Sequence, residues 1–256
     1  SDRDPANLDF GGCGADVVLE CTGAILSLEK AEAHLKGGVK KVVMSAPAKD
    51  DTPTYVYGVN HTEYKGETII SNASCTTNAL GPITKVLNDA VGIQKGIMTT
   101  VHSYTNDQNI LDVKHPKDKR RARAAAMNII PTSTGAAKAI GKVIPELNGK
   151  LNGFSLRVPT PDVSIVDLNC LLKRSVTKDE INEIFKNASQ NGYKGLIEYD
   201  DKMRVSSDFI GSSYSSIFVP DSTQVVDGDM VKIVAWYDNE WGYSSRLVDM
   251  AKHVGG

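Results

Sequence analysis

The first third of the chain alternates short apolar runs with an amphipathic stretch. Residues 15–21 and 41–44 are almost continuously apolar, as expected of strands that are buried on both faces. Between them, residues 27–36 carry apolar side chains at helical spacing, with a serine as the expected N-cap and two glycines as the stop signal. Another apolar piece, residues 68–70, comes just before a helical pattern that begins at Cys75. This order predicts a strand–helix–strand unit of α/β type.

The rest of the chain is richer in strand patterns. Helical spacing recurs at residues 75–89, 134–144, 177–189 and 241–254. Strand patterns occur at residues 96–102, 154–158, 164–172, 217–219 and 230–237. Between positions 103 and 126 the chain is polar and basic, as in a long loop. We therefore expect a small α/β part, then a more antiparallel α+β part, then a closing helix.

Composition narrows the classes of protein. A chain of 256 residues suits one large domain or two smaller ones, and its formal net charge of −2 gives no overall attraction to nucleic acid or membranes. No stretch approaches the roughly 20 consecutive apolar residues that cross a bilayer. The four cysteines, at positions 13, 21, 75 and 170, form neither a Cys-x-x-Cys pair nor a metal-ligand spacing. We expect free thiols, a cytoplasmic location and no metal.

Cys75 is the strongest candidate for chemistry. It lies within Ser-Cys-Thr-Thr-Asn, residues 74–78, where an apolar piece leads into a predicted helix. Backbone N–H groups at a helix N-terminus favour negative charge, so we expect a lowered pKa for this thiol and a nucleophilic thiolate. His102, at the end of a predicted strand, is the candidate base. By itself, a cysteine is more often a small buried hydrophobe, so the hypothesis depends on the residues around it.

Residues suited to bind anions supply that context. The guanidinium groups of Arg121 and Arg157 match phosphate geometry. Thr134–Gly135, at the start of a predicted helix, offers backbone N–H donors. Thr105 and Asp107 add a hydroxyl and a carboxylate soon after the candidate base. A thiol, a base and several groups that can bind phosphate together favour a catalytic site over ordinary packing.

Six segments, in order, resemble one known family. They are residues 74–78 (SCTTN), 102–108 (HSYTNDQ), 120–126 (RRARAAA), 132–138 (TSTGAAK), 157–161 (RVPTP) and 236–243 (WYDNEWGY). Each is similar to a motif of the phosphorylating glyceraldehyde-3-phosphate dehydrogenases of bacterial type. The motifs follow the order of that family and cover essentially the whole chain, so the resemblance is highly specific.

The resemblance implies a fold and an activity. The fold would be a partial Rossmann-like parallel sheet unit and an antiparallel-sheet catalytic domain, with a C-terminal helix returning to the nucleotide domain. Residues 1–74 would be the remaining part of the NAD-binding domain, 75–239 the catalytic domain and 240–256 the returning helix. The activity would be glycolytic oxidation and phosphorylation of glyceraldehyde 3-phosphate to 1,3-bisphosphoglycerate with NAD, in a cytoplasmic homotetramer.

The same resemblance implies roles for individual residues. Cys75 would form a thiohemiacetal and then a thioester, and His102 would activate the thiol and manage the proton on the hemiacetal oxygen. The substrate phosphate and inorganic phosphate would be held by residues Ser74, Thr76, Thr105, Asp107, Arg121, Thr134, Gly135 and Arg157. The cofactor would lie along residues Thr22, Gly23, Ser45, Asn239 and Tyr243, with the Asn239 amide toward the nicotinamide.

The chain departs from the family pattern at its start. The Gly-Gly-Cys-Gly run at residues 11–14 precedes the first apolar run and does not have the Gly-x-Gly-x-x-Gly spacing. Residues 1–14 resemble family sequence well inside the nucleotide domain, so we expect the first mononucleotide-binding half to be missing. We therefore expect this chain by itself to bind NAD weakly or not at all and to oxidise its substrate poorly. The choice between NAD and NADP stays open.

Three alternatives remain at this point. Erythrose-4-phosphate dehydrogenase is a close relative, although Thr-Ser-Thr-Gly at residues 132–135 resembles the glyceraldehyde 3-phosphate enzymes. A noncatalytic, oligomer-forming fragment is the second, because the loop at 104–123 resembles one at subunit contacts in that family. Ester hydrolysis by the thiolate is the third. The basic stretch 117–123 lacks interleaved aromatic residues, which disfavours nucleic-acid binding.

Overall fold

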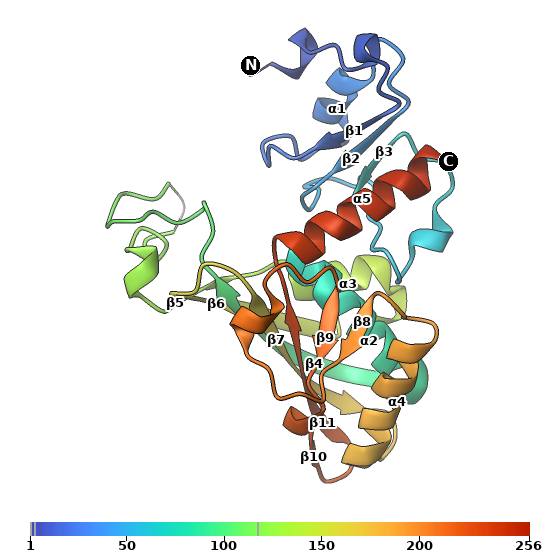
Figure 1. Ribbon diagram of the computed structural model, residues 1–256, viewed down its shortest axis with the longest axis vertical. Coiled ribbons are helices and arrows are strands. Elements are labelled where there is room, and N and C mark those ends of the chain that lie inside the picture. The colour runs from blue at the N-terminus through green and yellow to red at the C-terminus, as the bar shows by residue number, and fades with distance from the viewer. Residues whose placement is uncertain (1, 3, 117) are drawn as a thin grey trace. The chain divides into compact units, whose positions relative to one another are not determined.

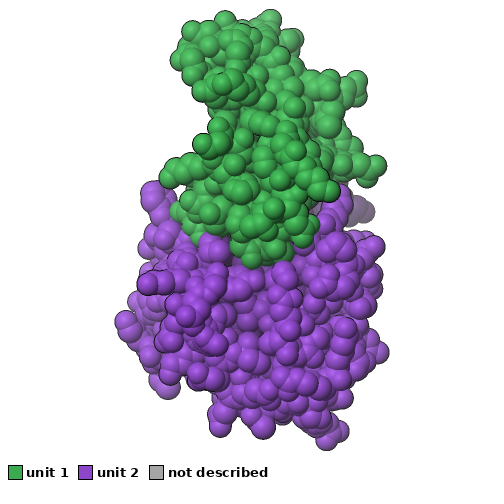
Figure 2. All heavy atoms as spheres, turned by 90° about the vertical axis from the view of Figure 1, so that its right-hand side faces the viewer, with its two compact units in different colours: residues 1–74, 244–256 green, residues 75–243 purple. Residues whose placement is uncertain are grey.

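The computed structural model describes residue 2, residues 4–116 and residues 118–256. The chain forms two compact units. Unit 1 consists of residues 1–74 and 244–256, and unit 2 consists of residues 75–243 (Figure 2). The chain therefore leaves unit 1 immediately before Cys75 and enters it again after Tyr243.

Unit 1 is built on a three-stranded parallel sheet. Strands β1 (Val17–Glu20), β2 (Lys41–Met44) and β3 (Ile69–Ser71) pair in that order, as Figure 1 shows. Helix α5 (Trp241–Gly255) supplies Leu247, Met250 and Val254 to a cluster with Val43 and Ile70. Ala31, at the end of helix α1 (Leu28–Ala31), packs with Val42, Met44 and Ile69 in a second cluster. The sheet thus has apolar side chains on both faces, which explains the continuous apolar runs in its sequence.

Unit 2 is built on a mixed eight-stranded sheet. Seven strands follow the order β5-β6-β4-β7-β11-β9-β8, and β10 pairs with β11 beside this path. Their bounds are β4 Ile93–Ser103, β5 Ile130–Ser133, β6 Leu151–Val158, β7 Ser164–Leu172, β8 Ile197–Tyr199, β9 Ser216–Phe218, β10 Gln224–Val226 and β11 Met230–Tyr237. The β4–β6 and β8–β9 pairs are parallel, and the remaining pairs are antiparallel. The predicted antiparallel sheet is therefore confirmed in most of its pairs.

Three helices cover one face of this sheet (Figure 1). They are α2 (Cys75–Val91), α3 (Ala136–Val143) and α4 (Lys178–Gln190). Helix α2 is almost wholly buried and contacts both other helices, although it contains Pro82. Phe185 of α4 stacks on Phe218 of β9 with ring centroids 4.1 Å apart. The catalytic candidate Cys75 is the first residue of the most buried helix, so its backbone position is firmly set.

On the other face of the sheet, several apolar side chains are exposed to solvent. Ile97 of β4, Phe154 of β6 and Met230 of β11 are all exposed. The strand registers place them on one face: Thr99 opposes Phe154 across β4 and β6, and Leu171 opposes both Lys95 and Met230. Since side chains alternate along a strand, these exposed residues lie opposite the face that the helices cover.

The predicted helix at residues 27–36 is only partly correct. The α-helix ends after four residues and continues as a 3-10 turn, Glu32–His34. Ser27 occupies the N-cap position, but its side chain makes no capping bond, and the Leu28 N–H instead donates to Asp50 Oδ2 at 2.7 Å. A carboxylate distant in sequence thus replaces the local cap, which sequence spacing does not reveal.

Candidate active site

Cys75 begins helix α2 after a strained turn. Strand β3 ends at Ser71, and Ala73 adopts a left-handed backbone conformation with φ of 57°. The Ala73 N–H donates to Ser71 Oγ at 3.1 Å, which holds this turn. A non-glycine residue in the left-handed region is uncommon, and such strain gathers at functional sites. The turn places the nucleophile candidate in the first turn of the helix, where backbone N–H groups point toward the helix start.

His102 lies next to Cys75. The imidazole Nε2 is 3.5 Å from Cys75 Sγ, within reach of proton transfer. His102 comes from the end of β4 and is only 3% exposed. The predicted pairing of these two residues is therefore present in the geometry.

The pKa of Cys75 differs from the sequence expectation. Burial raises the pKa of the thiol, and the Thr76 hydroxyl and the Arg157 charge offset only part of this effect. The expectation of a lowered pKa is wrong, because desolvation of the thiolate outweighs the helix N-terminus. Burial, and then the Arg157 charge, lower the pKa of His102 to about 4. Near neutral pH the pair is a thiol beside a neutral imidazole.

Arg157 and the Ser103 carbonyl compete for one nitrogen of that imidazole. Its Nη1 lies 2.6 Å from His102 Nδ1 and donates to the Ser103 carbonyl at 3.0 Å. His102 Nδ1 is also 2.7 Å from the same carbonyl. A guanidinium only donates and a carbonyl only accepts, so Nδ1 serves one of them at a time. In one tautomer Nδ1 accepts from the guanidinium and Nε2–H faces sulfur; in the other, Nδ1–H donates to the Ser103 carbonyl and Nε2 faces sulfur as an acceptor.

Tyr237 connects the nucleophile helix to the sheet. Its hydroxyl lies 2.9 Å from Thr76 Oγ1 and 2.9 Å from Thr100 Oγ1. Its ring meets the His102 ring edge-on, with centroids 5.9 Å apart. Burial raises the pKa of Tyr237, which keeps the hydroxyl protonated as a donor. The sequence analysis quoted Tyr237 within a motif but gave it no role, because its partners Thr76 and Thr100 are distant in sequence.

A second group surrounds Arg121. The guanidinium is paired with Asp107, and its Nε donates to Thr132 Oγ1 at 2.8 Å. Its Nη2 contacts the Ser133 carbonyl at 3.4 Å, immediately before Thr134. The Arg157 pKa responds to the charges of both Arg121 and Asp107, so the two arginines lie within electrostatic reach. Of the predicted basic stretch 117–123, position 117 lies outside the described residues.

Thr134 and Gly135 lie at the open start of helix α3. The Thr134 hydroxyl accepts the Ala136 N–H at 3.2 Å, and the Gly135 N-cap makes no side-chain capping bond. A Cβ added to Gly135 would meet no atom within 4 Å, so the space in front of this helix is clear. The helix N-terminus, the open space and the nearby Arg121 together form a fitting place for an anion.

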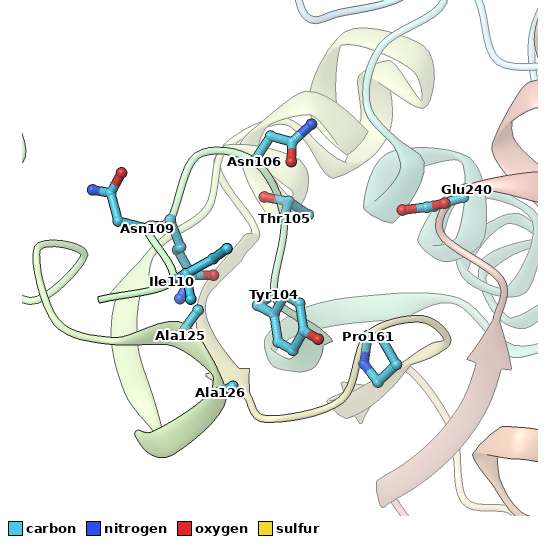
Figure 3. Close-up of a pocket in the computed structure, with 10 residues that line it drawn as sticks. Tyr104, Thr105, Asn106, Asn109, Ile110, Ala125, Ala126, Pro161 and Glu240 are labelled. Carbon is cyan, nitrogen blue, oxygen red and sulfur yellow. The ribbon is translucent and has the colours of Figure 1, made fainter. Parts of the chain in front are cut away.

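Thr105 lines a cavity of about 640 Å³ in unit 2. Figure 3 shows Thr105 and Tyr104 with Ile110 to one side and Glu240 and Pro161 to the other. Cys75, His102 and Arg157 are not among its lining residues, so this cavity lies beside the catalytic pair instead of around it. Ser74 directly precedes Cys75 in the chain.

Asn239 is held by two hydroxyl groups. Its Oδ1 accepts from Ser103 Oγ at 2.8 Å and from Ser164 Oγ at 2.7 Å. Because the oxygen is occupied twice, the carboxamide is fixed in orientation and its NH₂ donors are the groups offered to a ligand. Ser103 follows His102, so Asn239 is tied to the strand end that carries the candidate base.

The comparisons agree with this arrangement. The family model described as glyceraldehyde 3-phosphate dehydrogenase, C-terminal domain, matches residues 74–239. This chain belongs to the glyceraldehyde-3-phosphate dehydrogenase family. The glyceraldehyde-3-phosphate dehydrogenase of Geobacillus stearothermophilus is 55% identical over 256 residues, which are 99% of this chain and 76% of that protein. The enzyme of the same name from Xanthobacter flavus is 54% identical over 254 residues, with the same shares covered.

Because the chain belongs to the glyceraldehyde-3-phosphate dehydrogenase family, NAD is the expected cofactor. Unit 1 has residues that fit one end of this dinucleotide. Thr22–Gly23 follows β1 and Ser45 follows β2, at the carboxyl ends of parallel strands where nucleotides bind. Gly23 has φ of 68°, and a Cβ there would meet nothing within 4 Å. Buried Glu20 holds the turn by accepting the Thr22 N–H at 2.8 Å.

Two other kinds of site find no support among the described residues. No group of three or more His, Cys, Asp or Glu side chains in residues 2, 4–116 and 118–256 could hold a metal ion. Within the same residues, every helix is too short or too polar to cross a membrane.

Proposed function

We propose that this chain carries the catalytic machinery for oxidative phosphorylation of glyceraldehyde 3-phosphate to 1,3-bisphosphoglycerate. Membership of the glyceraldehyde-3-phosphate dehydrogenase family supports the reaction. The single observation that carries the site is Cys75 Sγ at 3.5 Å from His102 Nε2, on the first residue of a buried helix, with Arg157 against the same imidazole. A thiol, a base and a phosphate-binding cation thus lie side by side.

The substrate phosphate binds Arg157 and Thr105 in this proposal. Its charge draws the guanidinium away from His102 Nδ1, because a bidentate phosphate contact is stronger than one to a neutral ring nitrogen. Nδ1–H then donates to the Ser103 carbonyl, which already lies 2.7 Å away. In that tautomer Nε2 is a free acceptor facing Cys75 Sγ. Substrate binding therefore prepares the base.

Cys75 then attacks the aldehyde carbon. His102 Nε2 takes the thiol proton, a carbon–sulfur bond forms, and the carbonyl oxygen becomes an oxyanion near the N–H groups that begin α2. Imidazolium returns the proton to this oxygen to give a thiohemiacetal, and the neutral imidazole removes it again when the carbon is oxidised to the thioester. NAD, when bound, accepts the hydride from that carbon.

Inorganic phosphate completes the reaction by attacking the thioester. Arg121, Thr134 and Gly135 hold this phosphate, with Ser74 and Thr76 beside the sulfur. The open space at Gly135 and the Arg121 contact to the Ser133 carbonyl support this placement. Asp107 holds Arg121 in position through their ion pair. The new carbon–oxygen bond forms as the carbon–sulfur bond breaks, which regenerates Cys75.

Several parts of the sequence contribute to cofactor binding in this proposal. We assign residues 1–74 to the NAD-binding domain, residues 75–239 to the catalytic domain and residues 240–256 to a helix that returns to the NAD-binding part. In this proposal the residues that contact the cofactor are Thr22, Gly23, Ser45, Asn239 and Tyr243. The doubly fixed Oδ1 of Asn239 supports its role, because it leaves NH₂ donors for the nicotinamide amide.

The exposed apolar surface and the free thiols support a proposal for the oligomeric state and the cellular location. The helix-free face of the unit 2 sheet exposes Ile97, Phe154 and Met230, which supports a contact with a second copy in a homotetramer. Cys13, Cys21, Cys75 and Cys170 are all free thiols, which supports a reducing, cytoplasmic location.

The test compares two aldehydes and two cysteine variants. NADH formation is followed at the highest NAD concentration that the assay permits, because this chain is expected to bind NAD weakly. The aldehyde is glyceraldehyde 3-phosphate or erythrose 4-phosphate, with and without inorganic phosphate. The proposal expects phosphate-dependent turnover that favours glyceraldehyde 3-phosphate, its loss in Cys75→Ser, and its retention in Cys13→Ser, which changes an exposed thiol. Faster turnover of erythrose 4-phosphate, or unchanged activity in Cys75→Ser, would contradict it.

A further inference from the structure

A buried histidine in unit 1 has no part in the mechanism above. His34 ends the 3-10 turn Glu32–His34, and its side chain is only 4% exposed. It follows Ala31 by three residues, so the two side chains lie on the same face of this short helical segment. Ala31 packs with apolar residues of β2 and β3, and the same face brings His34 to the sheet. A polar ring is therefore held in the interior of unit 1.

Glu20, the last residue of β1, is the hydrogen-bond partner of this ring. His34 Nε2 lies 2.8 Å from Glu20 Oε2, and Glu20 is itself only 3% exposed. Burial by itself raises the pKa of Glu20, but the hydrogen bonds from Thr22 and His34 hold that pKa below its usual value. The carboxyl group is therefore ionised near neutral pH and can only accept. Since Nε2 faces this acceptor, Nε2 is the nitrogen of His34 that donates.

The other oxygen of Glu20 holds the turn that we assign to the cofactor. Oε1 accepts the Thr22 N–H at 2.8 Å and also the Thr22 hydroxyl. That hydroxyl in turn accepts the Ala24 N–H at 3.1 Å. The polar groups on both sides of Gly23 are thus used within the turn. Across residues 2, 4–116 and 118–256, no hydrogen-bond partner is present for the Gly23 N–H, so it is the donor that remains for a ligand.

His34 holds the carboxylate in the orientation that the turn requires. Within the described part of the chain, His34 is the one donor to Glu20 Oε2. A buried carboxylate oxygen without a partner is costly, so without His34 the side chain would turn toward solvent and Oε1 would leave Thr22. We propose that His34 is a positioning residue for the Thr22–Gly23 turn, which it fixes through Glu20. The contact of this turn with NAD rests on the proposed function; the chain of hydrogen bonds from His34 to Thr22 does not.

The surroundings of the imidazole agree with positioning and not with proton relay. A relay needs a hydrogen-bond partner at each ring nitrogen. His34 Nδ1 is buried, and none of the described residues bonds to it. On the side of the N-terminal segment, the Phe10 ring lies 6.0 Å from the imidazole between ring centroids. The ring therefore has one polar contact, and that contact is the Glu20 carboxylate.

Amide hydrogen exchange measures how firmly the turn is held. His34→Leu has a similar volume but no donor, and we expect the Thr22 and Ala24 N–H groups to exchange about tenfold faster, as for the loss of one hydrogen bond to a charged group. His34→Gln, whose carboxamide can donate to Glu20 Oε2, should restore the parental rates. Glu29→Gln changes an exposed carboxylate and should leave them unaltered. The amides of β2 should keep their parental rates in all three variants.

Three results would overturn the positioning role. The first is parental exchange at Thr22 and Ala24 in His34→Leu. The second is an equal acceleration in β2, which would mean that the whole of unit 1 has loosened. The third is faster exchange that persists in His34→Gln, because a donor at this position would then not be what holds the turn.

A second measurement separates this role from the proposed function. Millimolar NAD is added, and the backbone amide resonance of Gly23 is followed. We expect the resonance to shift in the parent chain and in His34→Gln, and to shift less in His34→Leu. An equal shift in His34→Leu would overturn the positioning of a cofactor contact. A parent chain whose Gly23 resonance does not respond would contradict the cofactor contact in the proposed function, while the exchange rates decide the link from His34 to the turn independently.

Discussion

At the scale of single residues, one hydroxyl connects the nucleophile to the sheet. Tyr237 bridges Thr76 on α2 and Thr100 on β4 at full burial. Removing it would leave two buried threonine hydroxyls with one partner fewer, while the ring itself would remain.

We therefore expect Tyr237→Phe to lower the free energy of unfolding by about 1–3 kcal/mol. It should also slow the alkylation of Cys75 by iodoacetamide, because Thr76 loses its anchor. Urea denaturation and the alkylation rate measure the two effects. Tyr199→Phe, on the edge strand β8, is the control and should change neither. Unchanged stability in Tyr237→Phe would show that the hydroxyl network does not hold the helix.

His102 makes stability depend on pH. Its pKa is about 4 in the folded protein against a usual 6.5, so the unfolded chain binds more protons between these values. Stability from this group is complete above pH 6.5 and is lost as the pH falls toward 4, by about 3 kcal/mol at most.

His102→Gln should remove this contribution, so its denaturation midpoint should fall less between pH 7 and 5 than that of the parent chain. An equal loss of stability on acidification in His102→Gln would contradict the neutral, buried imidazole.

The residues of the site differ in whether their sequence neighbours alone reveal their role. Cys75 and His102 could be predicted, because a cysteine at a strand–helix junction and a histidine at a strand end are visible along the chain. The direction of the Cys75 pKa could not, since it depends on how deeply α2 is buried.

At the scale of elements, two glycines differ in the space around them. Close backbone contact leaves no room for a side chain within the sheet, whereas the space at the proposed phosphate site is open. A Cβ on Gly153 of β6 would lie 2.4 Å from the Met98 carbonyl oxygen of β4, whereas one on Gly135 would meet nothing. The same substitution should therefore have opposite consequences at these two glycines.

We expect Gly153→Ala to destabilise unit 2 by about 3 kcal/mol through overpacking of the β4–β6 pair. Gly135→Ala should keep its melting temperature and raise the KM for inorganic phosphate, because the methyl group enters the space before α3. Thermal melts and phosphate kinetics of both variants test this. A normal phosphate KM in Gly135→Ala would argue against the anion site.

The bounds of strands with a strong hydrophobic pattern could be predicted from the sequence, whereas short strands could not be found in this way. The bounds of β2, β7 and β11 agree with the sequence, because long alternation or a fully apolar run leaves one register. Strands β8 and β10 have three residues each and carry too little pattern. Strand β5 contains Pro131, which argues against a strand unless it lies at a sheet edge, and β5 is the edge strand.

At the scale of the whole molecule, the helix-free face of the unit 2 sheet predicts assembly. Ile97 on this face is 63% exposed, and Ile210, after a 3-10 turn elsewhere in unit 2, is 61% exposed. We expect Ile97→Lys to shift the chain to smaller oligomers in light scattering, because a charge would be buried at the contact. Ile210→Lys should leave the mass unchanged. An unaltered mass in Ile97→Lys would place the contact on another surface.

Cofactor affinity is also a property of the whole chain. The 256 residues contain no Gly-x-Gly-x-x-Gly turn to cradle a pyrophosphate, although Thr22, Gly23 and Ser45 fit another part of a nucleotide. We expect calorimetric titration of this chain to detect NAD binding weaker than about 1 mM, a loss of several kcal/mol relative to micromolar binding. Micromolar binding would show that other residues hold the phosphates.

The discontinuity of unit 1 has a consequence for synthesis in the cell. Its sheet comes from residues 17–71, but Leu247, Met250 and Val254 complete the core over one face. A ribosome reaches these residues about 180 positions after β3, at roughly 5–20 residues per second. Until then, Val43 and Ile70 lack their covering helix while unit 2 already has its full sequence. Unit 1 is thus completed after unit 2, and for roughly 10–40 seconds its open apolar face is a place where a chaperone can bind.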